Sequence, residues 1–121
     1  MARRDITGAV DFRHLETFAA GDQQVVDEVL ELFREQAAIW VRLLDPVGDG
    51  WRDAAHSLKG SALGVGAFPL ADECEAAERA EKLEERILLA ESIRDALAAA
   101  LADIAAYAHE QALRSLKTPR A

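Results

Sequence analysis

The stretch DQQVVDEVLELFREQAAIWVRLLDPVGDG, residues 22–50, sets the architecture that the rest of the chain completes. Its apolar residues recur at intervals of three and four, as on one face of an α-helix. Asp22 is a residue type that caps helix starts, and the Pro and Gly residues of DPVGDG end the pattern. We therefore expect an amphipathic helix from about residue 22 to residue 44, with these apolar residues: Val25, Val26, Val29, Leu32, Phe33, Ala37, Trp40, Leu43 and Leu44.

Shorter helices are expected on both sides of this segment. Phe12, Leu15 and Phe18 predict a short helix that ends before Gly21 and lies across the end of a bundle. A helix over about residues 50–65 is closed by Gly66. Pro69 suits the first turn of the next helix, which carries Leu70, Cys74 and Ala77.

The last helix carries apolar residues at Ile87, Ala90, Ile93, Leu97, Leu101, Ile104, Ala108 and Leu113. No Gly or Pro lies between Pro69 and Pro119, so propensity alone would allow one helix of roughly 75 Å, at about 1.5 Å per residue. A domain of this size cannot cover such a rod, so we expect a turn within EKLEERI, residues 81–87, where charges cluster.

The fold class predicted from these elements is all-α, an antiparallel four-helix bundle with a short additional N-terminal helix. We divide the chain into an N-terminal extension (1–10), one helical bundle domain (11–117) and a C-terminal tail (118–121). The length of 121 residues suits a single core.

Composition limits the classes of partner. The chain has 50% hydrophobic and 30% charged residues and a net charge of −8, which disfavours nucleic acid and anionic membrane surfaces. Cys74 is the sole cysteine, so no internal disulfide forms. The longest apolar run, 96–102, is too short to span a bilayer, and no signal peptide follows the N-terminus. We expect a cytoplasmic protein.

His56 lies in AAHSLKGSALGVGA, residues 54–67, and its place on the helix decides its chemistry. At about 100° per residue, the apolar residues of this helix fall about 160° to 260° away from His56. They are Trp51, Ala54, Ala55, Leu58, Ala62 and Val65. Because they form one stripe opposite the imidazole, we expect His56 to face solvent.

The residues that share the face of His56 suggest a landing site for a partner. Lys59, one turn away, offers an ammonium group to a phosphate on the imidazole. Gly60 and Gly64 each cost about 1 kcal/mol relative to Ala inside a helix, but they let another surface approach closely. Leu63 offers that surface an apolar contact. The alternative is that Gly64 belongs to a frayed last turn and Gly60 has no role.

An exposed imidazole is largely neutral near pH 7 and attacks through a ring nitrogen, so the product that suits Lys59 is a phosphoimidazole. The sequence holds no P-loop and no kinase glycine motif for ATP. We therefore expect a phosphoryl carrier that is not a self-sufficient enzyme and binds no cofactor of its own. The in-line geometry and the Mg²⁺ that phosphoryl transfer needs are expected on the partner's site.

The segment AHSLKGSALGVGAFPLADECEAAE, residues 55–78, resembles the signature of histidine phosphotransfer (HPt) domains. These domains relay phosphoryl groups between response-regulator receiver domains or hybrid histidine kinases. The H-x-L-K-G-S core of the family matches at His56, Leu58, Lys59, Gly60 and Ser61, and its later positions match without a gap at Gly66, Ala67, Leu70, Cys74 and Glu78. FAAGDQQVVDEVLELF, residues 18–33, is similar to the first long helix of the family.

This resemblance implies that His56 is phosphorylated, that Lys59 stabilises the phosphoryl group and that Gly60 leaves room for the receiver. A polar residue at the position of Glu78 can lie near the histidine in relatives, so Glu78 is either an orienting group or a solvated carboxylate. The family often has Asn at Gly64 and Leu at Ala77, two departures that concern docking and packing. The implied partners are receiver domains and a sensor or hybrid histidine kinase.

Three alternatives come from other classes of function. A metal-binding bundle would need paired Glu-x-x-His motifs, which are absent; His14 and His109 are expected at the surface and Cys74 in the core. A non-catalytic docking module would bind a receiver or another partner without phosphorylation, but it does not require a His-Lys-Gly face. Dimerisation like that of histidine kinases is a third possibility; because one chain supplies four long helices, we expect a monomer.

Overall fold

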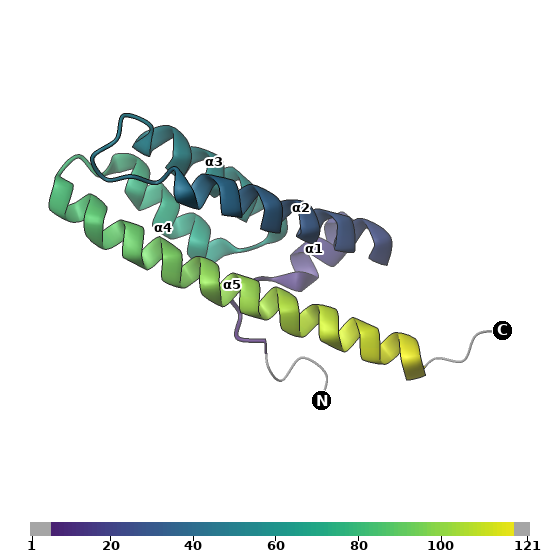
Figure 1. Ribbon diagram of the computed structural model, residues 1–121. Helices are drawn as coiled ribbons and strands as arrows, with labels where there is room; N and C mark the ends of the chain where they lie inside the picture. Colours follow the sequence, from purple (N-terminus) through teal and green to yellow (C-terminus); the bar gives the residue numbers. More distant parts are fainter. Residues whose placement is uncertain (1–5, 118–121) are drawn as a thin grey trace.

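The computed structural model describes residues 6–117, and five helices lie in that range (Figure 1). They are α1 (Phe12–Phe18), α2 (Gln23–Arg42), α3 (Trp51–Val65), α4 (Phe68–Arg79) and α5 (Leu83–Lys117). Helices α2 to α5 form an antiparallel bundle, α1 lies at one end, and residues 6–117 contain no strand. The predicted fold class is confirmed. The predicted tail 118–121 and residues 1–5 of the extension lie outside the described residues.

The ends of the helices follow local chemistry. Asp22 caps α2 as predicted, because its carboxylate accepts hydrogen bonds from the backbone N–H groups of Gln24 and Val25. Gly66 ends α3 with a left-handed φ of 83°, and a Cβ there would lie 2.7 Å from the carbonyl oxygen of Asp11. The N–H of Asp11 donates to the Gly66 carbonyl at 2.8 Å. Gly66 therefore allows the end of α3 to touch the start of α1.

The core is built around the apolar stripe of α3, all of which is buried as predicted. Trp51 is among the largest buried side chains, and its Nε1–H donates to the carbonyl oxygen of Ala77 at 2.7 Å. This bond joins the first turn of α3 to the last turn of α4. The other buried residues of the stripe are Ala54, Ala55, Leu58, Ala62 and Val65.

Some residues of the predicted stripes lie outside the core. Phe18, Leu32, Leu43, Ile87 and Leu113 are exposed. In α2 the buried face is narrower than the predicted stripe. Leu32 lies about 100° around the helix axis from the buried Phe33, which places Leu32 outside the buried face. In α5, Ile87 lies about 120° from buried Ile93, and the drift of three- and four-residue steps carries Leu113 further away. Leu30, which the prediction left out, is buried.

The turn between α4 and α5 comprises residues 80–82, so it overlaps the start of the predicted range 81–87. Helix α4 ends at Arg79, its C-cap Ala80 is extended, and α5 begins at Leu83, so most of residues 81–87 is helical. The charges in this stretch include Glu84 and Glu85 in the first turn of α5, where the helix dipole favours acidic side chains. Arg86 holds the turn, since its Nε–H donates to the Ala80 carbonyl at 2.9 Å.

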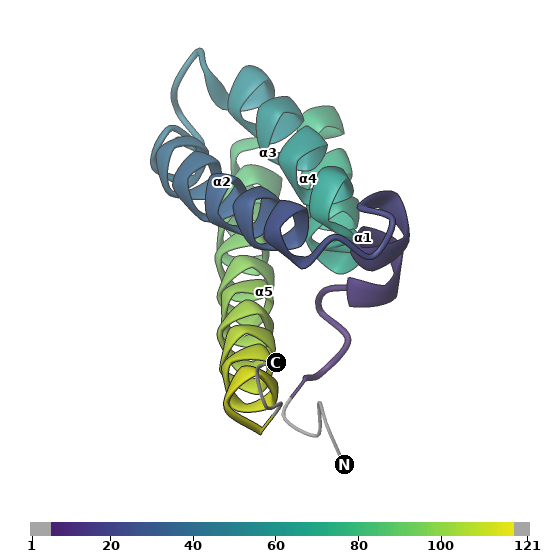
Figure 2. The same cartoon turned by 90° about the vertical axis from the view of Figure 1, so that its right-hand side faces the viewer.

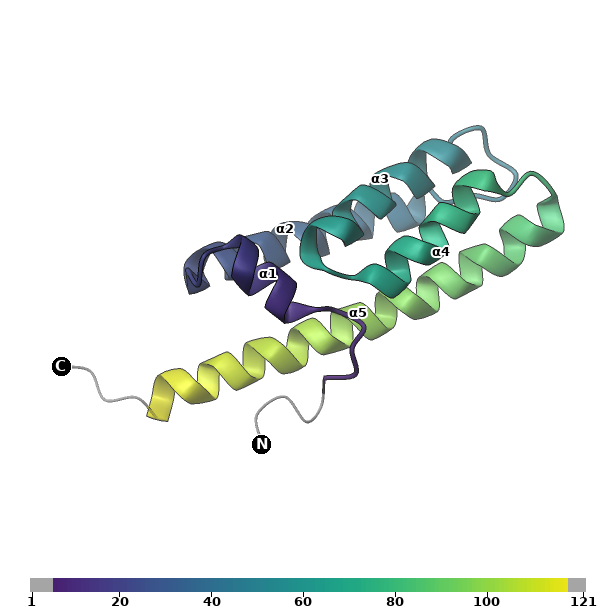
Figure 3. The ribbon, with the colours of Figure 1, turned by 180° about the vertical axis from the view of Figure 1, so that it is seen from behind.

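The N-terminal segment crosses α5 before α1 begins, as Figure 3 shows. The buried carboxylate of Asp103 on α5 accepts hydrogen bonds from Thr7 (backbone N–H and Oγ1) and from the N–H groups of Ala9 and Val10, at 2.9 to 3.3 Å. One turn further, Tyr107 stacks on Phe12 with ring centroids 4.3 Å apart. These contacts attach residues 7–12 to α5.

Helix α5 has 35 residues, about 52 Å at about 1.5 Å per residue. Its C-terminal end extends past the other helices (Figure 2). None of the helices within residues 6–117 has an apolar stretch long enough to cross a membrane.

The contacts of Asp103 give a stability prediction. Asp103→Ala leaves the N–H groups of Thr7, Ala9 and Val10 without this acceptor, and the Val10 bond is buried, so we expect the free energy of unfolding to fall by about 3 kcal/mol. Urea unfolding followed by circular dichroism measures it. Asp95→Ala, at an exposed site on the same helix, should change it by less than about 0.5 kcal/mol. Equal losses in the two variants would contradict the role given to Asp103.

Candidate functional site

His56 lies in the middle of α3 on the face opposite the buried stripe. Its side chain is 70% exposed, as the periodicity of the sequence predicts. The imidazole is therefore available to another molecule while the backbone that carries it is fixed by the core.

Glu78, in the last turns of α4, contacts both polar groups of the α3 face. Its Oε2 lies 3.2 Å from His56 Nδ1 and its Oε1 lies 2.7 Å from Lys59 Nζ. The side chains of Lys59 and Glu78 are each 22% exposed, so Glu78 is not a freely solvated carboxylate. Arg52 adds a link between the helices, since its Nε–H donates to the Glu78 carbonyl at 3.0 Å.

The environment of Glu78 determines its charge and the proton on His56. Burial raises the pKa of Glu78, but contacts from Lys59 and His56 outweigh burial and hold the pKa below its ordinary value. An ionised carboxylate only accepts hydrogen bonds, so His56 Nδ1 must carry the proton that Glu78 receives. In the neutral imidazole, Nε2 then keeps its lone pair.

The glycines beside His56 leave open space. A Cβ added at Gly60 or Gly64 would meet no atom within 4 Å outside the local helix backbone. Gly64 is a residue of α3, and the helix ends at Gly66, so Gly64 is not a frayed end in the structure. Leu63 is 46% exposed on the same face.

The two flanks of the α3 face lie against different helices. Arg52 and Lys59 contact Glu78 and so face α4. Asp53 lines an open pocket together with Trp40 and Leu43 of α2, so this flank faces α2. Gly60 is seven residues, about two turns, from Asp53 and shares its flank. The open space that Gly60 leaves beside His56 is thus on the α2 side.

Several exposed apolar residues and inter-helix contacts near the site are not evident from the sequence. Leu32 and Ile39 of α2 and its C-cap Leu43 are each more than half exposed, although Leu32 and Leu43 belong to the predicted apolar stripe. The bonds from Trp51 and Arg52 to α4 were also missed. No signal in the sequence reports them, because they depend on the relative placement of two helices.

Other reactive groups give no second site of this kind. Burial, together with the negative charge of Glu78, raises the pKa of the Cys74 thiol to about 12, so Cys74 is a protonated core residue. Residues 6–117 contain no group of three His, Cys, Asp or Glu that could hold a metal ion. His14 and His109 are exposed, as predicted.

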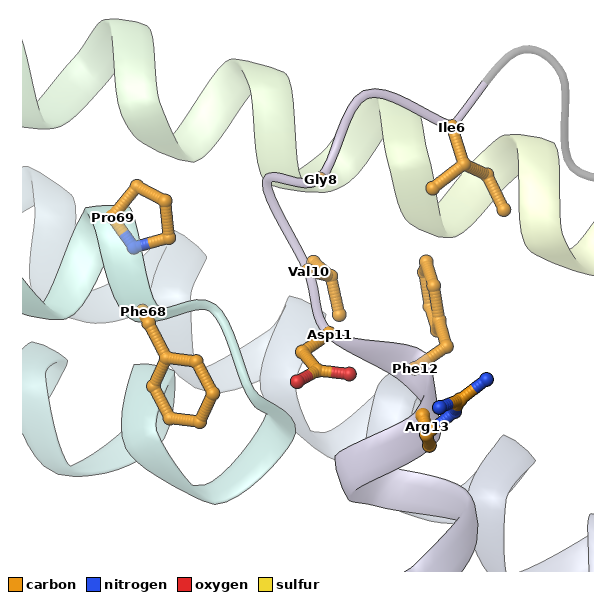
Figure 4. Close-up of a pocket in the computed structure, with 8 residues that line it drawn as sticks. All are labelled: Ile6, Gly8, Val10, Asp11, Phe12, Arg13, Phe68 and Pro69. Atoms are coloured by element: carbon orange, nitrogen blue, oxygen red, sulfur yellow. The ribbon is translucent and has the colours of Figure 1, made fainter.

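An open crevice of about 440 Å³ lies where the N-terminal segment meets α1 and the start of α4 (Figure 4). Most of its lining is apolar: Ile6, Gly8, Val10, Phe12, Phe68 and Pro69, with Asp11 and Arg13 as the charged residues. The residues of the His56 face do not line it.

Comparison with known proteins matches a family model and a solved structure. The family model for the Hpt domain matches residues 23–107, which include α2, α3, α4 and most of α5. The chain is similar to the solved structure of the histidine phosphotransferase ShpA from Caulobacter crescentus, with 63% sequence identity and a TM-score of 0.76. The match covers 91% of this chain and 100% of the ShpA chain. Comparison with curated proteins gives no match.

The lowered pKa of Glu78 predicts a pH-dependent contribution to stability. Because the folded pKa lies below the unfolded one, the contribution is complete above the unfolded pKa and is lost as pH falls through the folded pKa. We expect Glu78→Gln to be less stable than wild type by about 1 kcal/mol at about pH 7, with little difference at about pH 3. Urea unfolding at both pH values measures this.

A matched control for this measurement is Glu75→Gln, on the exposed side of the same helix. It should shift the free energy of unfolding by less than about 0.5 kcal/mol at either pH. A loss in Glu78→Gln that is the same at both pH values would contradict the ion pair as its cause.

Proposed function

The chain belongs to the Hpt domain family, and we propose that it serves a two-component phosphorelay by carrying the phosphoryl group on His56. One observation carries this proposal: His56 is 70% exposed while its Nδ1 contacts the carboxylate of Glu78. A core histidine would be buried, and a surface histidine without a role would not need a fixed ring.

The proposed step is a transfer between an aspartyl phosphate and the imidazole. The Nε2 lone pair of His56 attacks the phosphorus of the phosphorylated receiver, an N–P bond forms, the O–P bond to the receiver aspartate breaks, and the aspartate leaves as a carboxylate. The reverse reaction returns the group to a receiver. Both directions use the same atoms.

Glu78 and Lys59 are proposed to stabilise charge on the two sides of the ring. Attack through Nε2 places positive charge on an imidazole that still holds the Nδ1 proton, and the Glu78 carboxylate accepts that N–H and stabilises it. Lys59 is one turn from His56 and keeps Glu78 ionised; its ammonium also stabilises the phosphoryl oxygens. Glu78 is thus a positioning residue and Lys59 a phosphoryl-stabilising one.

The partners are those of a phosphorelay, namely histidine kinases and response regulators. Gly60 and Gly64 give a receiver domain access to His56, and Leu63 provides an apolar contact. Mg²⁺ is expected on the receiver, and this chain is expected to bind no cofactor. We further propose a cytoplasmic monomer that binds neither nucleic acid nor membranes, on the basis of its acidic charge and its single bundle.

The alternative is a docking module that binds a receiver without being phosphorylated. That function needs an open surface, which Gly60 and Gly64 supply, but it makes no use of a histidine whose ring is held through one nitrogen. Phosphotransfer uses both features.

Transfer from a phosphorylated receiver tests the proposal. With Mg²⁺ and a receiver domain labelled on its aspartate, wild type should acquire an acid-labile label and His56→Ala should acquire none. His109→Ala removes an exposed histidine of α5 and should be labelled like wild type. Equal labelling of His56→Ala and wild type, or no label on wild type, would contradict the proposal.

A further inference from the structure

Acidic and apolar side chains alternate along one line of α2. They are Glu28, Leu32, Glu35 and Ile39 of α2 and its C-cap Leu43, which is still in the αR conformation. Because they follow one another in steps of three and four residues, they lie on one face. We call these five residues the α2 ridge. All five residues are exposed, and the three apolar ones have relative solvent exposures of 51% to 56%. The ridge therefore presents both charged and apolar surface to solvent.

The α2 ridge lies away from α5 and toward α3. Gln23 is nine residues from Leu32, about half a turn around the axis, and accepts a hydrogen bond from Tyr107 of α5 at 3.3 Å. Leu43, at the other end of the ridge, lines an open pocket with Asp53 of α3. The α2 ridge therefore lies on the solvent-exposed side of α2 that is nearer to α3 than to α5.

The register of the two helices brings the α2 ridge next to His56. Helices α2 and α3 are antiparallel neighbours, and Leu43 and Asp53 line the same pocket. An equal rise per residue then places Ile39 level with Ser57, one residue from His56, and Leu32 level with Gly64. A partner that reaches His56 across the open glycine flank covers the ridge as well.

The charged residues on and beside the α2 ridge are mostly acidic. Glu28 and Glu35 lie on the α2 ridge, and the pocket at its end is lined by Asp45 and Asp53 with Arg42 as its basic residue. Four carboxylates thus surround three exposed apolar side chains and one guanidinium group. Like charges brought together at an interface disfavour a partner, whereas opposite charges speed its association.

We infer that the α2 ridge selects among receiver domains, favouring those whose surface beside the active-site aspartate carries apolar side chains flanked by Lys or Arg. The inference rests on the proposed function of His56. Burial of Leu32, Ile39 and Leu43 contributes affinity, and Glu28 and Glu35 steer basic receivers toward the site and repel acidic ones.

The test measures transfer from His56 to two receiver domains, one basic and one acidic around its active site. Each protein is first phosphorylated with phosphoramidate, a small donor that needs no docking surface, and transfer is compared at equal phosphohistidine. In about 0.05 M salt, Glu28→Lys/Glu35→Lys should lower the transfer rate to the basic receiver at least about tenfold and raise that to the acidic one. In about 0.5 M salt both effects should shrink to less than about twofold.

The matched control is Glu91→Lys/Asp95→Lys, which makes the same change of charge at exposed positions of α5. It should transfer to both receivers within about twofold of wild type. Equal effects of the two double variants, or no effect of either, would overturn the inference. Absence of transfer from wild type to both receivers would contradict the proposed function itself, and the inference with it.

The apolar part of the α2 ridge has its own variant. Ile39→Ser should slow transfer to the basic receiver about tenfold at both salt concentrations, because a loss of apolar burial is not screened. Leu88→Ser, at an exposed leucine of α5, should leave the rate within about twofold of wild type. Equal rates for Ile39→Ser and Leu88→Ser would remove the apolar part of the inference.

Discussion

The packing of α3 against α4 is the constraint on which the site depends. The bond from Trp51 Nε1 to the Ala77 carbonyl, at 2.7 Å, fixes the start of α3 against the end of α4. Glu78 is the next residue after Ala77, so the same contact sets the position of its carboxylate, along the helix axis, relative to His56. A shift of one helical turn, about 5.4 Å, would take Glu78 out of reach of His56. A core contact thus controls the orientation of an exposed side chain.

The site has two sides with different properties, one with polar contacts to α4 and one that is open toward α2. On the α4 side, Glu78 contacts the imidazole, and Arg52 and Lys59 contact Glu78. On the α2 side, Gly60 and Gly64 leave space, although glycine inside a helix costs about 1 kcal/mol relative to Ala. The buried stripe of α3 offsets this cost. Gly60 and Gly64 therefore give access to His56 but lower the stability of α3, and the packing of α3 in the core offsets this loss.

Much of this organisation could be predicted from the sequence because it is local. The exposure of His56 follows from the apolar stripe opposite it, and the cap at Asp22 and the end at Gly66 follow from residue type. Periodicity could not tell that Leu32 and Leu43 lie outside the core, because that depends on the width of the contact with neighbouring helices.

The turn before α5 and the contacts of Glu78 were harder to predict for a related reason. The charges of residues 81–87 suit a helix start as well as a turn, and Arg86 decides between them through a contact with Ala80. The resemblance to HPt domains left Glu78 as either an orienting group or a solvated carboxylate. The choice required the distance between two helices, which the sequence does not encode locally.

In the proposed function, the Glu78 carboxylate keeps the proton of neutral His56 on Nδ1, so Nε2 is the nucleophile. Nitrogen NMR of the ¹⁵N-labelled imidazole tests it most directly, in wild type and in Glu78→Ala, before and after phosphorylation with phosphoramidate. We predict that neutral His56 in wild type carries its proton on Nδ1, that the phosphoryl group is on Nε2, and that Glu78→Ala shifts the proton toward Nε2. A proton on Nε2 in wild type, or a phosphoryl group on Nδ1, would contradict the account.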